Sequence, residues 1–216
     1  MQCQIIQDSF LERRLSDPYV IEHDGEAVGY GLVPNKYYEH TVCEFYVAPP
    51  HRRSALPMFR TLLEVSQARH IRTQTNDPLL LLMLYDCASN ITADNVLFAD
   101  RFTTSLPRPP GAVARAKDKR NEEWVIEHGG HIAASGGLLF HYNPPYGDIF
   151  MDVEQRYRQQ GFGSYLVQEL KRACYEMGKI PAARCGPDNA ISRRTLEKAG
   201  MLPCGRVLQG DVTLTR

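Results

Sequence analysis

The sequence lacks an excess of charge of either sign. Its 25 Lys and Arg residues balance 25 Asp and Glu residues, which gives a formal net charge of zero. Proteins that are held to nucleic acid or to anionic membranes by general electrostatic attraction usually carry a basic surplus. The composition therefore predicts neither a nucleic-acid partner nor a membrane partner.

Long hydrophobic runs are absent as well. The longest apolar stretch, Leu79 to Tyr85, has seven residues, whereas a membrane-spanning helix needs about 20. The first residues, Met1 to Ile5, show no basic region followed by an apolar segment, which a secretory signal would have. With 16 Gly and 14 Pro among 216 residues, collagen and low-complexity disorder are excluded. We expect a globular cytoplasmic protein, monomer or homodimer, with one large or two small domains.

The cysteines lack the spacing of a metal site. The six are widely scattered and no Cys-x-x-Cys occurs, so we expect reduced, partly buried thiols and no bound metal. The pair His128 and His131 resembles a ligand pair. Gly129 and Gly130 between them favour a hairpin turn instead.

One short word occurs twice in the chain. Val20-Ile21-Glu22-His23 recurs as Val125-Ile126-Glu127-His128, at an offset of 105 and with an aromatic residue before each copy. A glycine-containing turn and an apolar run come next in both places, as in a β-hairpin. The word alone is short enough to recur by chance in two unrelated hairpins.

The segments after each copy of the word also recur in order. A strand ending at Val47 precedes Arg52 by five residues, and a strand ending at Val153 precedes Arg158 by five. An amphipathic helix, a short strand and a second helix then complete both halves. We therefore expect two copies of a β-β-β-α-β-α unit, residues 1–107 and 115–216. They are joined at the proline-rich segment 106–111, which can continue neither a helix nor a central strand.

The second copy contains a glycine-rich loop between a strand and a helix. The strand ends at Val153, the loop contains Gly161 and Gly163, and Gly178 ends the helix. The apolar face of that helix is expected to consist of Phe162, Leu166, Leu170, Ala173 and Met177. Free amides and about +0.5 charge at a helix N-terminus favour phosphate groups. The loop is neither a dinucleotide fingerprint, because Leu166 takes the place of its third glycine, nor a Walker loop.

Two blocks in this half resemble the signatures of the GNAT N-acetyltransferase superfamily. These are V-x-x-x-x-R-x-x-G-x-G at 153–163 and N-x-x-S-x-x-x-L-x-K-x-G at 189–200. The resemblance implies an α/β (α+β) fold with two units, each a mixed, mostly antiparallel sheet flanked by helices. It also implies that the fourth and fifth strands splay apart in the C-terminal unit to admit acetyl-CoA.

The resemblance further implies a set of cofactor-binding residues. Backbone groups near Met151 and Val153 would pair with the pantetheine arm, and Arg158 would add positive charge at the loop. The pyrophosphate would lie on the amides of Gln160, Gly161, Phe162, Gly163 and Ser164. Asn189 and Ser192 would lie near the cofactor, although Asn189 has an alternative as the cap of the helix that begins after it.

The catalytic groups are less well defined. On the fourth strand Asp148 and Asp152 point to the same face, and by the resemblance Asp148 is the first candidate base and Asp152 the second. Either carboxylate has the alternative of a solvated edge residue. Leu196 stands where many relatives have a tyrosine acid, which leaves Tyr157 and Cys185 as weakly supported substitutes.

The first half keeps the pattern but changes the loop. Ala55-Leu56-Pro57 replaces Gly161-Phe162-Gly163, and Leu80-Leu81-Leu82 replaces Ser192-Arg193-Arg194. We expect these three leucines to be buried rather than to bind a ligand. Because proline has no amide hydrogen, we expect a degenerate copy. The sequence thus predicts an acetyl-CoA-dependent N-acetyltransferase acting on a small amine or peptide amine. The alternative is a non-catalytic acyl-CoA-binding or regulatory module. Residues 141–147 form a candidate acceptor loop, or else a packed turn.

Overall fold

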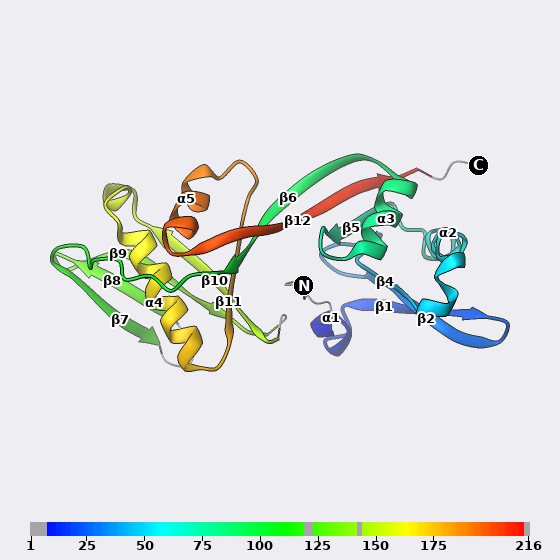
Figure 1. Cartoon of the computed structure of the whole chain (residues 1–216), viewed down its shortest axis with the longest axis horizontal. Coiled ribbons are helices and arrows are strands. Elements are labelled where there is room, and N and C mark those ends of the chain that lie inside the picture. Colours follow the sequence, from blue (N-terminus) through cyan, green and yellow to red (C-terminus); the bar gives the residue numbers. More distant parts are fainter. Residues whose placement is uncertain (1–7, 119–122, 142–143, 214–216) are drawn as a thin grey trace. The chain divides into compact units, whose positions relative to one another are not determined.

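The computed structural model describes residues 8–118, 123–141 and 144–213 (Figure 1). The first half contains α1 (Asp8–Glu12), β1 (Ser16–His23), β2 (Glu26–Pro34), β3 (Thr41–Val42), β4 (Glu44–Val47), α2 (Ala55–Ser66), β5 (His70–Gln74), α3 (Pro78–Cys87) and β6 (Ala88–Asp100). The second contains β7 (Ala112–Asp118), β8 (Glu123–His128), β9 (His131–Leu139), β10 (Tyr146–Val153), α4 (Phe162–Glu176), β11 (Ile180–Cys185), α5 (Ala190–Lys198) and β12 (Met201–Val212). The predicted repeat is confirmed from β1 and from β8 onward, with β3 and β4 together in the place of β10. The elements α1 and β7 have no counterpart, and each copy ends in one further strand, β6 or β12.

Both predicted hairpins turn in the same way. Asp24 and Gly25 join β1 to β2 with φ of 52° and 82°, and Gly129 and Gly130 join β8 to β9 with φ of 57° and 77°. Two successive positive φ angles are the mark of the type I′ turn, whose twist matches that of the strands. The His128-to-His131 segment is therefore a hairpin end. Within the described ranges no group of three or more His, Cys, Asp or Glu residues is placed to hold a metal ion.

The chain forms two compact units, and the final strand of each repeat completes the sheet of the other unit. Unit 1 comprises the chain up to Asn95 together with the residues from Gly205 onward, and unit 2 is Val96–Cys204. Residues 96–99 of β6 pair antiparallel with β11, and residues 207–211 of β12 pair antiparallel with β5.

These units differ from the predicted ranges 1–107 and 115–216, which left each final strand with its own repeat. A physical reason lies in β6, which runs for 13 residues without a glycine or proline that would turn it back. It therefore continues from one unit into the other.

Unit 2 is a single sheet with helices on one face. The strands have the order β6-β11-β10-β9-β8-β7, and α4 packs against β8 to β11 (Figure 1). The predicted apolar face of α4 lies in the core of this unit at Phe162, Leu166, Leu170 and Ala173. Met177 was predicted on this face but is 42% exposed, because it is the C-cap residue and Gly178 has already left the helix with φ of 66°.

Unit 1 contains the three-stranded sheet β1-β2-β4 and the strands β3-β5-β12. These last three belong to the nine-stranded sheet that also includes the strands of unit 2. Its core contains Phe59 and Leu63 from α2, Leu80 and Leu84 from α3, and Leu208 from β12. The prediction that Leu80-Leu81-Leu82 is buried fails at Leu82, which is 54% exposed on the outer face of α3. No helix in the described part of the chain is long and apolar enough to cross a membrane.

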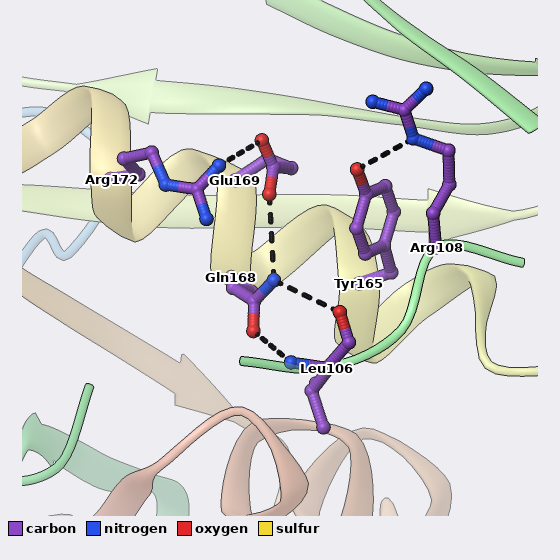
Figure 2. A network of polar contacts seen from close by, with 6 residues as sticks. All are labelled: Leu106, Arg108, Tyr165, Gln168, Glu169 and Arg172. Atoms are coloured by element: carbon purple, nitrogen blue, oxygen red, sulfur yellow. Dashed lines mark hydrogen bonds and ion pairs between the residues drawn. The ribbon is translucent and has the colours of Figure 1, made fainter. Parts of the chain in front are cut away.

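The segment between the repeats lies along α4 within unit 2 (Figure 2). The Gln168 side chain accepts a hydrogen bond from the Leu106 amide at 2.6 Å and donates one to the Leu106 carbonyl at 3.4 Å, while Arg108 Nε donates to the Tyr165 hydroxyl at 3.2 Å. Nearby, the buried Lys171 ammonium forms an ion pair with Asp100 at 2.7 Å. The same ammonium donates to the Phe102 carbonyl at 2.6 Å. The proline-rich join is therefore held to this unit by polar contacts.

Candidate active site

β10 and β11 are neighbours over only the first half of β10. They pair in parallel over four positions, the last of which joins Ile149 to Ala183. Beyond that point β10 stays paired with β9 as far as Val153, while β11 pairs with β6. The predicted divergence of the fourth and fifth strands is confirmed. From Phe150 to Val153, the edge of β10 that faced β11 has no strand partner among the described residues.

The N-terminus of α4 opens beside this fork. Gly161 is the N-cap residue, with φ of 89°, and no described side chain caps the helix. The first amide to bond back into the helix is that of Tyr165, which donates to the Gly161 carbonyl at 3.0 Å. The amides of Phe162, Gly163 and Ser164 therefore have no acceptor within the helix, and the helix dipole adds positive potential at the same place.

The helices that come after β5 and β11 begin differently, because a side chain caps each. Asp77 accepts a hydrogen bond from the Leu80 amide at 3.2 Å at the start of α3, and Asn189 accepts one from the Ser192 amide at 2.9 Å at the start of α5. The capping alternative for Asn189 is thus present in the structure. Of α3, α4 and α5, only α4 begins without a side-chain cap.

A cavity of about 510 Å³ lies between the end of β10, the start of α4 and one face of α5. Most of the predicted site residues line it, namely Met151, Asp152, Val153, Arg158, Gly161, Gly163, Ser164, Asn189 and Ser192. Gly163 marks where the three elements converge, since a Cβ there would stand 3.1 Å from Val153 and 3.2 Å from Thr195. An alanine at this position would require the Val153 and Thr195 side chains to shift by a few tenths of an ångström.

Three predicted residues do not line the cavity. Phe162 is 2% exposed, and its ring packs against those of Tyr157 and His128 with centroids 5.5–5.6 Å apart. Gln160 donates from its side chain to the Arg156 carbonyl at 2.9 Å. Asp148 is buried at the paired end of β10 and forms an ion pair with Arg184 at 3.3 Å.

Family models match two successive parts of the chain. Residues 1–101 match the acetyltransferase (GNAT) domain, and residues 95–201 match the acetyltransferase (GNAT) family. The chain belongs to the GNAT family. It carries two GNAT domains in tandem, and membership makes it an acyltransferase.

Solved structures share the fold of this GNAT protein. A GNAT-family acetyltransferase from Colwellia psychrerythraea has a TM-score of 0.77 at 13% identity, over 93% of this chain and 87% of the other. A tandem GNAT protein from the clavulanic acid biosynthesis pathway has a TM-score of 0.63 at 12% identity, over 93% and 84%. A GCN5-related N-acetyltransferase from Sphaerobacter thermophilus has 0.60 at 16%, over 90% and 80%. No curated protein sequence matches the chain.

The GNAT cavity includes residues that the sequence analysis did not single out. Ile191, Arg194, Thr195 and Lys198 form one face of α5 toward it, and Gln159 lines it from the loop. The spacing of three or four residues in α5 was visible in the sequence and could have identified this face. With Arg158, the cavity has three cationic side chains against one carboxylate, Asp152.

Of the two substitute acids in this GNAT unit, only Tyr157 lines the cavity. Leu196 is buried in the core, as an apolar residue should be. Burial raises the pKa of the Cys185 thiol, and this residue does not line the cavity. Tyr157 does line it, and its hydroxyl donates to the His128 carbonyl at 3.4 Å. Part of the candidate acceptor loop, residues 142–143, lies outside the described residues.

The first GNAT unit keeps the arginine contact that follows the last strand before the helix, but it lacks the glycine-rich loop. Arg52 Nε donates to the Val47 carbonyl at 3.2 Å, and Arg158 Nε donates to the Val153 carbonyl at 3.0 Å. Here α2 starts at Ala55 with Pro57 in its first turn. Because Pro57 has no amide hydrogen, the set of donors at the start of α4 is not reproduced.

Proposed function

We propose that this protein is an acetyl-CoA-dependent N-acetyltransferase that acetylates the primary amine of a small molecule or peptide, with unit 2 as its catalytic unit. The observation that carries the proposal is the uncapped N-terminus of α4, which opens onto a cationic cavity beside the fork of β10 and β11. Diphosphate binding at such a helix start needs free amides, glycine and positive charge. All three are present here.

The residues of unit 2 suit each part of the ligand. Amides of residues 161–164 would hold the pyrophosphate, while Arg158, Arg194 and Lys198 would supply charge to its phosphates. The unpaired edge of β10 from Met151 to Val153 can hydrogen-bond the amide groups of the pantetheine arm as a further strand would. Bound in this way, acetyl-CoA presents an activated acyl group at the fork.

Acyl transfer to an amine requires the protein to position the two reactants and to remove a proton from the amine. Holding the amine and the thioester together replaces a bimolecular encounter with an oriented one. An alkyl amine, with a pKa near ~10, arrives mostly protonated, so a base must remove a proton. We propose Asp148 for this role because it lies one residue before the last β10–β11 pair, at the fork itself. Asp152, at the outer end of β10 and 77% exposed, is the second candidate.

The alternative is an acyl-CoA-binding or regulatory module without catalysis. It is favoured by Leu196, which buries an apolar side chain where many relatives have an acid. It is also favoured by the ion pair of Asp148 with Arg184, since a carboxylate that only balances a neighbouring arginine needs no substrate.

One experiment separates the two. Calorimetry measures acetyl-CoA binding, and a thiol-reactive dye measures CoA release over a panel of primary amines and peptide N-termini. We expect tight binding and amine-dependent CoA release. Binding without release for every amine would select the regulatory module, and absence of binding would contradict both.

A further inference from the structure

Unit 1 also has a crevice where its strands part. β3 pairs in parallel with β5 at Thr41 and Val42, and β4 then leaves to pair with β2 instead. This repeats the fork of β10 and β11 in unit 2. A cavity of about 260 Å³ lies at the fork of unit 1, lined from β2, β4, β5, the start of α3, and β12. The crevice of unit 1 is therefore still open, although this unit lacks the glycine-rich phosphate loop.

The polar groups of this crevice are balanced in sign. Arg52 and Arg72 line it together with Glu44 and Asp77, whereas the cavity of unit 2 has three cations and one carboxylate. Arg72 is further neutralised by an ion pair with Asp94. With no surplus positive charge and with Pro57 in the first turn of α2, the crevice is not built for a diphosphate.

Arg52 provides an anion-binding group. Its Nε is used by the Val47 carbonyl, and its two Nη groups make no hydrogen bond or ion pair with the described residues. They can therefore take a carboxylate in the planar, two-pronged geometry that guanidinium favours. Glu44 offers the opposite charge, and a carboxylate has acceptor positions for an ammonium group in addition to its contacts within the protein.

The remaining lining is aromatic and apolar. Tyr30 and Tyr46 stack with centroids 5.9 Å apart and are each 42% exposed, and Leu79 and Val207 add aliphatic surface. Cys43 also lines the crevice, but burial raises its pKa to about 12, so it is a neutral thiol and no nucleophile at neutral pH. The crevice suits reversible binding rather than covalent acyl transfer.

We propose that the crevice of unit 1 binds a small zwitterion, an α-amino acid with an apolar or aromatic side chain. The carboxylate lies on Arg52, the ammonium group on Glu44, and the side chain against Tyr30 and Tyr46. The cavity has about half the volume of that in unit 2, which fits a ligand of this size and not a nucleotide cofactor. Unit 1 is then a ligand-binding unit rather than a scaffold alone.

The test titrates the full chain with the 20 standard α-amino acids one at a time, by calorimetry and ligand-observed NMR. Each amino acid that binds is compared with the matched amine lacking the carboxylate and the matched acid lacking the amine. We expect at least one apolar or aromatic amino acid to bind, and both single-charge analogues to bind at least 10-fold more weakly.

Variants then locate the site. Glu44→Gln, Arg52→Gln and Tyr46→Ala should each weaken amino-acid binding at least 10-fold, with acetyl-CoA binding unchanged. Arg158→Gln, the matched change in unit 2, should leave amino-acid binding unchanged. Thermal unfolding of each variant identifies any that fails to fold, and the partly exposed Tyr46 provides a change outside the charged groups.

Three outcomes overturn the proposal. These are no binding by any amino acid at 10 mM, equal binding by the single-charge analogues, or binding that survives all three unit 1 variants. An amino acid whose binding is lost only in Arg158→Gln binds in the cavity of unit 2, which would leave the transferase proposal standing and remove this one.

Discussion

At the scale of single residues, the glycines at the two ends of α4 allow the effect of a substitution on ligand binding to be distinguished from its effect on backbone strain. Gly161 and Gly178 both have positive φ, 89° and 66°, and neither would place a Cβ within 4 Å of another group. Alanine at either position costs about 1–2 kcal/mol, because a side chain disfavours this region. Only Gly161 lines the cavity.

We therefore expect Gly161→Ala to weaken acetyl-CoA binding at least 10-fold and Gly178→Ala to leave it unchanged. Both variants should lower the free energy of unfolding by similar amounts. Calorimetry and denaturant titration measure the two quantities. If the variants bind acetyl-CoA equally well, the loop does not hold the phosphates.

The two aspartates of β10 can be told apart by their pH profiles. If Asp148 is the base, Asp148→Asn should lower kcat by about 10²–10⁴ and remove the acidic limb of the kcat/KM profile. Asp152→Asn should change kcat less than 10-fold and keep that limb. Arg184→Gln is the control for a structural role, because it breaks the same ion pair. An acidic limb that persists in Asp148→Asn would exclude this residue as the base.

The role of a single residue could be predicted where it depends on neighbours that are close in the sequence. The loop glycines, Arg158 and Asn189 occur in short patterns whose geometry depends on one strand, one loop and one helix start. The ion pair of Asp148 was not predictable, since Arg184 lies on another strand and reaches Asp148 only through the β10–β11 register. The burial of Phe162 depends in the same way on His128, from a distant hairpin.

At the scale of elements, the start of α3 carries a pH dependence. Burial raises the pKa of the Asp77 carboxyl above its ordinary value of 3.8, against the lowering effect of the amides it caps. In the folded state the charged form is therefore disfavoured relative to the unfolded chain. This penalty is absent well below pH 3.8, grows as the pH rises above 3.8, and is constant once the pH exceeds the raised pKa.

Asp77→Asn keeps a side-chain oxygen for the Leu80 amide and removes the charge. We expect the variant to match the wild type in free energy of unfolding near pH 3, and to exceed it by a margin that grows above pH 3.8 and levels off once the pH exceeds the raised pKa. Urea titrations from pH 3 to pH 8 measure the difference. Asn189→Asp, at the exposed cap of α5, is the comparison and should show no such gain. A difference that does not vary with pH would show that burial leaves the Asp77 carboxyl unperturbed.

Elements themselves were well predicted, because periodicity and turn residues report local structure. The hairpins and α4 occur in the predicted order. The fork of β10 and β11 is also present, but it was implied by the resemblance to the family and not by local patterns. The end of α4 was misjudged at Met177, whose apolar character suggested the core although Gly178 already turns the chain. Hydrophobicity alone does not define the last turn of a helix.

At the scale of the whole molecule, the partner of a strand could not be predicted from its place in the chain. A repeat in the sequence suggests that each copy folds on itself, yet β6 pairs with β11 and β12 pairs with β5. Strand propensity is the same for either partner. The choice depends on which sheet edge the strand reaches, and that information is not local.

The pairing of β6 with β11 and of β12 with β5 predicts which fragments of the chain fold on their own. A fragment of residues 96–204 retains β6 beside β11 and keeps Asp100 paired with Lys171. A fragment of residues 115–216 loses both, along with the Leu106 contacts of Gln168. An uncompensated buried charge costs about 3–5 kcal/mol, a large share of the roughly 5–15 kcal/mol that stabilises a domain.

We therefore expect residues 96–204 to unfold cooperatively and to bind acetyl-CoA, and residues 115–216 to do neither. Thermal unfolding followed by circular dichroism, together with calorimetry, measures both fragments. Lys171→Met in residues 115–216 tests the cause, because removing the buried charge should recover part of the lost stability. Full acetyl-CoA affinity in unmodified 115–216 would mean that each repeat folds alone, since the strand and the ion pair supplied by the first repeat would then be dispensable.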